Sequence, residues 1–210
     1  MKLKNLIFAS SLALMGIMTV NTAHAHPHVF VEANMDVVLN DEGKFTELRF
    51  VWRFDEVFST TIQFDYDSNG NGKMDDNEVQ EISDTVKESI AEYDFYTAMR
   101  SGTKALQFYE PEEIKTYFKD GQMIMLLALE PETPYDFANG PLRLSASDTS
   151  YYVAFDFDSK NVVLEGNSKG CNKEIVHPNF DDLYADETLT ESFFDQPNNL
   201  NLDDEFYSWA

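Results

Sequence analysis

The segment that decides the fold is residues 29–54, VFVEANMDVVLNDEGKFTELRFVWRF. Every second residue from Val29 to Leu39 is apolar, and a similar alternation runs from Leu48 to Phe54. A period of two residues is typical of a strand with one buried face. The cluster NDEG at residues 40–43 favours a tight turn, so the segment predicts a β-hairpin.

The hydrophobic spacing becomes helical after Phe54. Apolar residues recur at steps of three and four on both sides of a loop rich in Asp, Asn and Gly at residues 65–77, which indicates two helices. Farther along, short apolar runs separated by proline and glycine predict more strands. These runs are residues 105–109, 114–118, 123–129, 142–146, 151–157 and 162–165.

The predicted fold is therefore of the α+β class. We expect a β-rich domain at residues 26–178, built on a sandwich-like antiparallel sheet. An EF-hand-like helix–loop–helix is inserted in it at about residues 54–100. Residues 179–210 are acidic and interrupted by Pro197, which predicts a loosely packed tail.

The first 25 residues have the pattern of an export signal. Lys2 and Lys4 precede a mostly apolar stretch at residues 6–20, and Ala23-His24-Ala25 is a site that signal peptidase accepts. The apolar stretch is short for a membrane span. The sequence therefore predicts a signal peptide at residues 1–25, cleavage after Ala25, a periplasmic location and no membrane insertion of the mature chain.

The net charge of the chain excludes some classes of binding partner. It contains 15 Lys and Arg against 38 Asp and Glu, a formal net charge of −23. Nucleic acids and anionic membranes repel such a surface, so neither is expected as a partner. Cys171 is the only cysteine, which excludes a disulfide within the chain.

The strongest motif is DSNGNGKMDDNE at residues 67–78. It matches the calcium-loop pattern D-x-[DN]-x-[DN]-G-x₅-E, and helices are predicted on both sides of it. Because only one such loop is visible, we expect a structural brace and not a signalling switch. The predicted Ca²⁺ ligands are the side chains of Asp67, Asn69, Asn71, Asp75 and Glu78 and the backbone carbonyl of Lys73.

A second candidate metal site lies at the predicted mature amino terminus, which begins His26-Pro27-His28. A free amine beside its own imidazole chelates Zn²⁺, Ni²⁺ or Cu²⁺, and His28 adds another imidazole. Pro27 has no N–H, which excludes the square-planar site that needs a deprotonated second amide. The alternative is that His26 and His28 simply precede the first strand.

Several further motifs occur along the chain, namely HPHVF at 26–30, WRFDEVFS at 52–59, the loop at 67–78, YDFYT at 93–97, SDTSYYVAFDF at 147–157 and GC at 170–171. In these motifs the chain resembles domain-of-unknown-function family one-thousand-and-seven, exported Gram-negative proteins often labelled the periplasmic component of an ABC-type transport system. The resemblance implies a periplasmic location and, through frequent gene neighbours, an association with nickel/cobalt-type or zinc transporters. Members tend to carry Asp-Pro-Thr-Tyr where this chain has DTSY at residues 148–151, so that turn lacks a proline.

These observations predict a periplasmic calcium-binding accessory protein associated with an inner-membrane transition-metal transporter. One alternative is a calcium-stabilised protein-interaction module with no transition-metal role. Another is a histidine-brace copper enzyme. An enzyme is not expected and no catalytic residue is predicted, because no G-x-S-x-G, H-E-x-x-H or phosphate-binding loop occurs.

Overall fold

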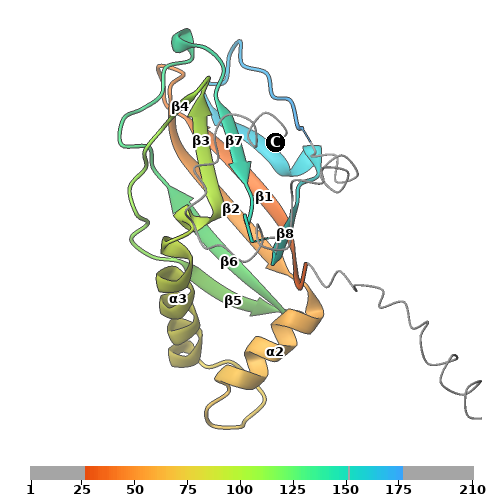
Figure 1. Ribbon diagram of the computed structural model, residues 1–210. Coiled ribbons are helices and arrows are strands. Elements are labelled where there is room, and N and C mark those ends of the chain that lie inside the picture. Colours follow the sequence, from red (N-terminus) through yellow and green to blue (C-terminus); the bar gives the residue numbers. More distant parts are fainter. Residues whose placement is uncertain (1–26, 151, 177–210) are drawn as a thin grey trace, which may run out of the picture.

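The computed structural model describes residues 27–150 and 152–176, which form two β-sheets and two α-helices (Figure 1). The larger sheet has the order β5-β6-β2-β1-β8, and β9 also pairs with β1. The smaller sheet has the order β4-β3-β7. The helices are α2 (Glu56–Tyr66) and α3 (Asp76–Ala91). The strands are β1 (Val29–Leu39), β2 (Phe45–Phe54), β3 (Thr97–Ser101), β4 (Lys104–Ala105), β5 (Lys115–Lys119), β6 (Gln122–Leu129), β7 (Arg143–Ala146), β8 (Val153–Asp156) and β9 (Val162–Gly166).

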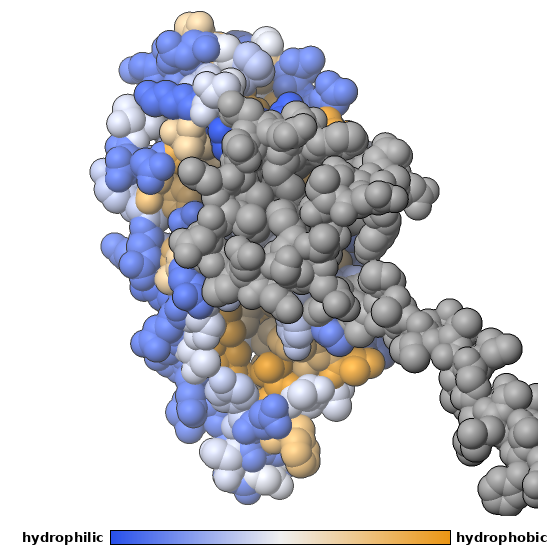
Figure 2. Space-filling view, in the orientation of Figure 1, coloured by the Kyte–Doolittle hydropathy of each residue, from blue (hydrophilic) through white to orange (hydrophobic). Residues whose placement is uncertain are grey.

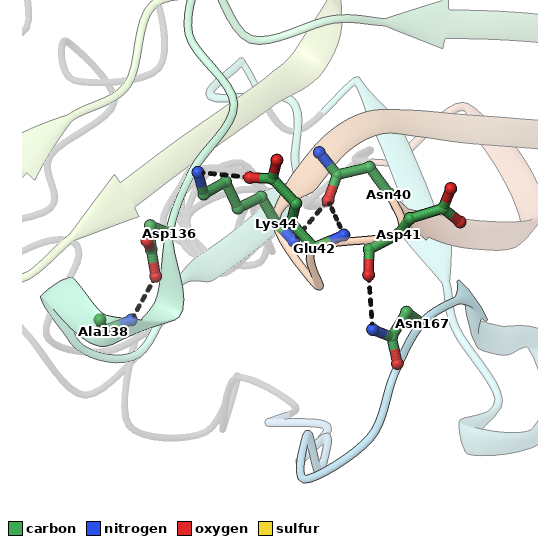
Figure 3. A network of polar contacts seen from close by, with 7 residues as sticks. All are labelled: Asn40, Asp41, Glu42, Lys44, Asp136, Ala138 and Asn167. Atoms are coloured by element: carbon green, nitrogen blue, oxygen red, sulfur yellow. Dashed lines mark hydrogen bonds and ion pairs between the residues drawn. The ribbon is translucent and has the colours of Figure 1, made fainter.

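The predicted hairpin is formed by β1 and β2, which pair antiparallel with Ala33 opposite Trp52. Its turn is held by the Asn40 side chain, whose Oδ1 accepts hydrogen bonds from the amides of Glu42 and Lys44 at 3.0 and 2.9 Å (Figure 3). Asn167 Nδ2 donates to the carbonyl of Asp41 at 2.8 Å. The turn is therefore fixed both by its own sequence and by the chain that follows β9.

One face of the larger sheet forms the core. The alternate residues of β1, β2 and β6 that point to this face are buried, and Trp52 is 2% exposed. Burial of each large apolar side chain contributes about 1.5–3 kcal/mol. The smaller sheet lies over part of the same face (Figure 1), where Met99 of β3 joins the core cluster. Nearly all the alternating apolar residues of the hairpin are therefore buried in the core.

Helix α2 packs against β6 and α3 against β5, and each helix is joined to the sheet by a buried serine. Ser59 of α2 is fully buried and accepts a hydrogen bond from the backbone N–H of Met123 at 2.9 Å. Ser83 of α3 lies 2.9 Å from the hydroxyl of Thr116 on β5. Within the described chain no helix is both long enough and apolar enough to cross a membrane.

The strand-rich α+β class is confirmed, and most neighbouring strands pair antiparallel as expected, but the larger sheet also contains parallel pairs. Strands β8 and β9 both lie parallel to β1, with Val29 opposite Val153 and Met35 opposite Val162. A parallel neighbour requires a long connection, and the chain supplies one because most of the domain lies between β1 and β8. The larger sheet is therefore mixed.

The helix–loop–helix follows the first hairpin as predicted, but its second half is shorter than expected. Helix α3 ends at Ala91, and residues 97–101 are strand β3, within the region assigned to the insertion. The predicted strand at 105–109 is reduced to β4, followed by an isolated bridge between Phe108 and Pro131. The predicted signal peptide at 1–25 and the tail at 179–210 lie outside the described residues.

Candidate functional site

The loop between the two helices contains five of the six predicted calcium ligands, and the sixth, Glu78, lies in the first turn of α3. Helix α2 ends at Tyr66 and α3 begins at Asp76, so residues 67–75 connect them at one end of the molecule (Figure 1). Gly72, at the sixth position of the motif, has φ +74°, a conformation that favours glycine. Met74 packs against the core. The loop is thus anchored at a defined place and bends where the motif requires it.

The first half of the loop turns its side-chain oxygens toward its own backbone. The Asp67 carboxylate accepts from the amides of Asn71 at 3.0 Å and Gly72 at 2.7 Å. Asn69 Oδ1 accepts from the amide of Asn71 at 3.0 Å, and Asn71 Oδ1 accepts from the amide of Lys73 at 2.7 Å. These bonds close the chain into a tight curve with its oxygen atoms on the inside.

Glu78 connects the two ends of the loop. Although it is charged, its side chain is only 1% exposed. Oε2 accepts from the amide of Asp75 at 3.0 Å, which completes a capping box at the start of α3. Oε1 accepts from the amide and the hydroxyl of Ser68, both at 2.9 Å. These bonds, that from Asp75 first and those from Ser68 next, hold the pKa of Glu78 below its ordinary value.

Asn69 lies between two of the carboxylates. Its Nδ2 donates to Asp75 Oδ2 at 2.8 Å and to Glu78 Oε1 at 3.3 Å. Asn71 Nδ2 also donates to Asp75 Oδ2, at 3.1 Å. Among the residues that the structure describes, no three His, Cys, Asp or Glu side chains are grouped closely enough to hold a metal ion. In this arrangement amide N–H groups occupy the place between the carboxylates.

The donor set nevertheless fits calcium. Rotating the amides of Asn69 and Asn71 about their last bond exchanges N–H for oxygen without moving the backbone. The loop would then offer hard oxygens from three carboxylates and two amides, the ligands that Ca²⁺ prefers. Lys73 is exposed, so its ammonium is not buried against the cation. Ser68 was not among the predicted site residues, because the motif leaves the second loop position unspecified.

The structure places only one of the two predicted transition-metal ligands. His28 is exposed immediately before β1, its amide donates to the Tyr152 carbonyl at 2.9 Å, and its ring lies 5.1 Å from the Tyr152 ring. His26 lies outside the described residues, as does His177. The structure therefore does not test whether the histidines meet.

A strained turn lies within the motif YDFYT at residues 93–97, and its conformation was not predicted from the sequence. Asp94, Phe95 and Tyr96 have φ of 49°, 52° and 54°, and such left-handed conformations are unfavourable for residues other than glycine. Phe95 is buried at 4% exposure, and Tyr96 packs against Phe155 with ring centroids 5.7 Å apart. Burial raises the pKa of Tyr96 above its ordinary value. The aromatic packing therefore holds a backbone that residue preferences would not predict.

Comparison with known proteins identifies the family. A family model described as "Protein of unknown function (DUF1007)" matches residues 11–208, nearly the whole chain. This chain belongs to the DUF1007 family. The loop at residues 67–78, the strained turn and His28 all lie within the stretch that matches the DUF1007 model.

A curated relative of this DUF1007 chain comes from Spirochaeta aurantia. It is described as "Uncharacterized 15.5 kDa protein in trpE 3'region" and is 27% identical over 99 residues, which are 47% of this chain and 70% of the relative. No solved structure matches this DUF1007 protein.

Proposed function

We propose that this protein is an exported calcium-binding accessory protein in which residues 67–78 hold one Ca²⁺. The observation that carries the proposal is the position of Glu78. Its buried carboxylate is already held by the amides of Ser68 and Asp75, at the point where the motif places the ligand that closes the loop. A carboxylate held in this way loses little conformational freedom when it binds a cation.

The expected role of the ion is to brace the two helices. In α2 only Ser59 is fully buried, whereas α3 buries Glu78, Ile82, Ser83 and Ile90. A cation bound between the end of α2 and the start of α3 fixes the weakly packed helix to the well-packed one. Binding to the folded chain raises its free energy of unfolding. Once the calcium concentration exceeds the dissociation constant, this increase grows with the logarithm of the concentration.

Calorimetric titration of the purified chain with CaCl₂ tests the proposal. We expect one site with a dissociation constant of about 10⁻³ M or lower, that is, an affinity at least as high as that of the weakest extracellular calcium modules. E78Q keeps a side chain that can cap α3 but removes the charge, and it should weaken binding about tenfold or more. D76N is the matched control, since Asp76 is exposed and is not a predicted ligand. Absence of binding to the unaltered chain at 10⁻² M CaCl₂, about ten times the weakest expected constant, refutes the proposal.

A role beside a transition-metal transporter is proposed on a separate observation. His28 is exposed beside the first strand, and cleavage after Ala25 would place a free amine on His26, two residues earlier. Together they would offer nitrogen ligands for Zn²⁺, Ni²⁺ or Cu²⁺. The test compares the cleaved chain with a variant that carries one extra residue before His26. Equal affinities for these ions in both chains refute the terminal site.

A calcium-stabilised interaction module is the competing function. Its support is the apolar surface of α2, where Val57 and Phe64 are 79% and 83% exposed. Figure 2 shows hydrophobic surface in the lower half of the molecule, where α2 lies. This function predicts that neither Zn²⁺, Ni²⁺ nor Cu²⁺ binds the cleaved chain, while V57S and F64S leave calcium affinity unchanged and abolish partner binding.

A further inference from the structure

Helix α2 carries apolar residues on two of its sides. On the inner side, Phe58 and Ile62 pack against the core. On the outer side, Val57 and Phe64 are 79% and 83% exposed. These two residues are seven positions apart, which is about two helical turns, so they lie on the same side of the helix about 10 Å apart. An apolar helix face that points away from the core is typical of a surface that a partner covers.

Two exposed threonines, Thr60 and Thr61, lie between Val57 and Phe64 on this side of the helix. The hydroxyl of Thr60 donates to the carbonyl of Glu56 at 2.7 Å. The hydroxyl of Thr61 donates to the carbonyl of Val57 at 3.0 Å. Because both hydroxyl protons are already donated within the helix, a partner does not have to supply acceptors for them. We call these four residues the outer face of α2.

Phe30 of β1 adds an exposed aromatic ring beside the start of α2. Its side chain is 55% exposed. Its amide donates to Asp55 Oδ2 at 3.0 Å, and its carbonyl accepts from the amide of Asp55 at 3.0 Å. Asp55 is also the N-cap of α2, since its Oδ1 accepts from the amide of Phe58 at 2.9 Å. The start of the helix is therefore held at a fixed position next to Phe30.

The charged residues around the outer face of α2 are all negative. Residues 54–72 contain four acidic residues and no Lys or Arg. Glu56 and Asp65 are exposed at the two ends of the helix and flank the outer face on opposite sides. Within the described part of the chain, neither carboxylate has a hydrogen bond or an ion pair. Asp65 lies in the last turn, where the helix dipole disfavours a carboxylate, so a cation from a partner would be stabilising there.

We propose that the outer face of α2 binds a positively charged amphipathic segment of another protein. Apolar side chains of that segment cover Val57 and Phe64, and its Lys or Arg side chains pair with Glu56 and Asp65. These two carboxylates are nine residues apart, so the partner's cations must be about 13 Å apart along the helix. The inference names the partner of the interaction module described above and does not depend on calcium binding.

The charge of the chain selects this partner over two others. A second copy would bring the same carboxylates together, in a chain with a formal net charge of −23. An anionic membrane would be repelled in the same way. A cationic segment instead gains both burial of apolar surface and electrostatic attraction, which speeds its association.

Fluorescence anisotropy with two synthetic helical peptides tests the proposal. Both peptides carry leucine along one side; lysine flanks the leucines in the first peptide, and glutamate flanks them in the second. The full chain is titrated into each peptide in EDTA, so the result does not depend on the calcium proposal. We expect the lysine peptide to bind and the glutamate peptide not to bind. The affinity for the lysine peptide should fall several-fold between about 0.05 M and 0.2 M NaCl, because salt screens the charge pairs.

Substitutions on the outer face separate specific binding from general hydrophobic attraction. F64S should raise the dissociation constant of the lysine peptide about tenfold or more, since an aromatic residue at the centre of a contact carries much of the binding energy. V57S should act in the same direction. Y117S is the matched control, because Tyr117 is 50% exposed on β5, outside the proposed contact, and it should leave the affinity unchanged. Circular dichroism of each variant verifies that it is folded.

A second pair of variants separates the proposed ion pairs from the general negative charge of the chain. E56Q/D65N should weaken binding of the lysine peptide several-fold. E81Q/E88Q removes the same number of carboxylates from exposed positions of α3 and should have little effect.

Several results would overturn the proposal. They are absence of binding to the lysine peptide, equal affinity for the glutamate peptide, equal effects of F64S and Y117S, or equal effects of the two double variants. A dimer in analytical ultracentrifugation that F64S abolishes would assign the face to a second copy instead. Binding to phosphatidylcholine vesicles that F64S abolishes would assign it to a lipid surface. A chain that binds the lysine peptide but not calcium refutes the calcium proposal alone, and the reverse result refutes this inference alone.

Discussion

The hydroxyl of Ser59 lies 2.9 Å from the backbone nitrogen of Met123 and accepts its hydrogen bond inside the protein. The same hydroxyl donates to the carbonyl of Asp55 at 2.6 Å. One buried side chain thus connects the N-cap residue of α2 to strand β6. The fourth residue of a marginally packed helix is the point where that helix is attached to the sheet.

S59A should therefore lower the free energy of unfolding by about 1–3 kcal/mol, since it leaves the Met123 N–H buried without an acceptor. Urea denaturation followed by circular dichroism measures the change. S89A is the control, because Ser89 is exposed and bonds only to the preceding turn of α3. It should change stability by about 0.5 kcal/mol or less. Equal effects of the two substitutions would contradict the assignment.

Glu78 should make stability depend on pH. Its pKa in the folded chain is lowered from 4.5 by hydrogen bonds that favour the ionised form. The stabilisation is therefore complete above the unfolded value and is lost as the pH falls through the folded value. In EDTA, the unfolding free energy of the wild type should fall more steeply between about pH 5 and pH 3 than that of E78Q. D76N should retain the wild-type slope.

Gly166 should not tolerate alanine. It has φ +82°, and a Cβ placed there would lie 1.9 Å from the carbonyl oxygen of Leu39, the last residue of β1. G166A should destabilise the protein by about 3 kcal/mol or more, since backbone must move at the β1–β9 pairing. G102A provides the comparison, because Gly102 has φ +56° and open space around it. It should cost about 1–2 kcal/mol.

The strained turn predicts a reversal of the usual glycine penalty. At Asp94, which is exposed and has φ 49°, D94G should be more stable than D94A by about 1 kcal/mol. At Glu88, exposed within α3, E88G should be less stable than E88A by about the same amount. Thermal unfolding of the four variants measures both differences. The same sign at both positions would show that the turn is not left-handed in solution.

The parts of the fold that depend on residues close together in the sequence could be predicted from it. The hairpin and the loop between α2 and α3 follow from local alternation, turn residues and motif spacing. Strand β3 was missed because Thr97–Ser101 is short and follows a turn whose conformation contradicts the preferences of Asp, Phe and Tyr. The parallel pairing of β8 and β9 with β1 was missed because it depends on tertiary contacts.

The candidate site shows the same division. The motif gave the candidate calcium ligands, and the helices predicted on both sides of it are present. The hydrogen bonds of Ser68 to Glu78 could not be predicted, because they depend on how the loop curves back on itself.

The pairing of β1 with β8 and β9 has a consequence for how the protein is made. Among the described strands β1 is synthesised first, yet one of its edges finds its partners only when residues 153–166 have been made. Until then that edge offers unpaired backbone groups to any neighbouring chain. The newly made polypeptide therefore carries an open sheet edge until β8 and β9 are available, and the larger sheet can close only then.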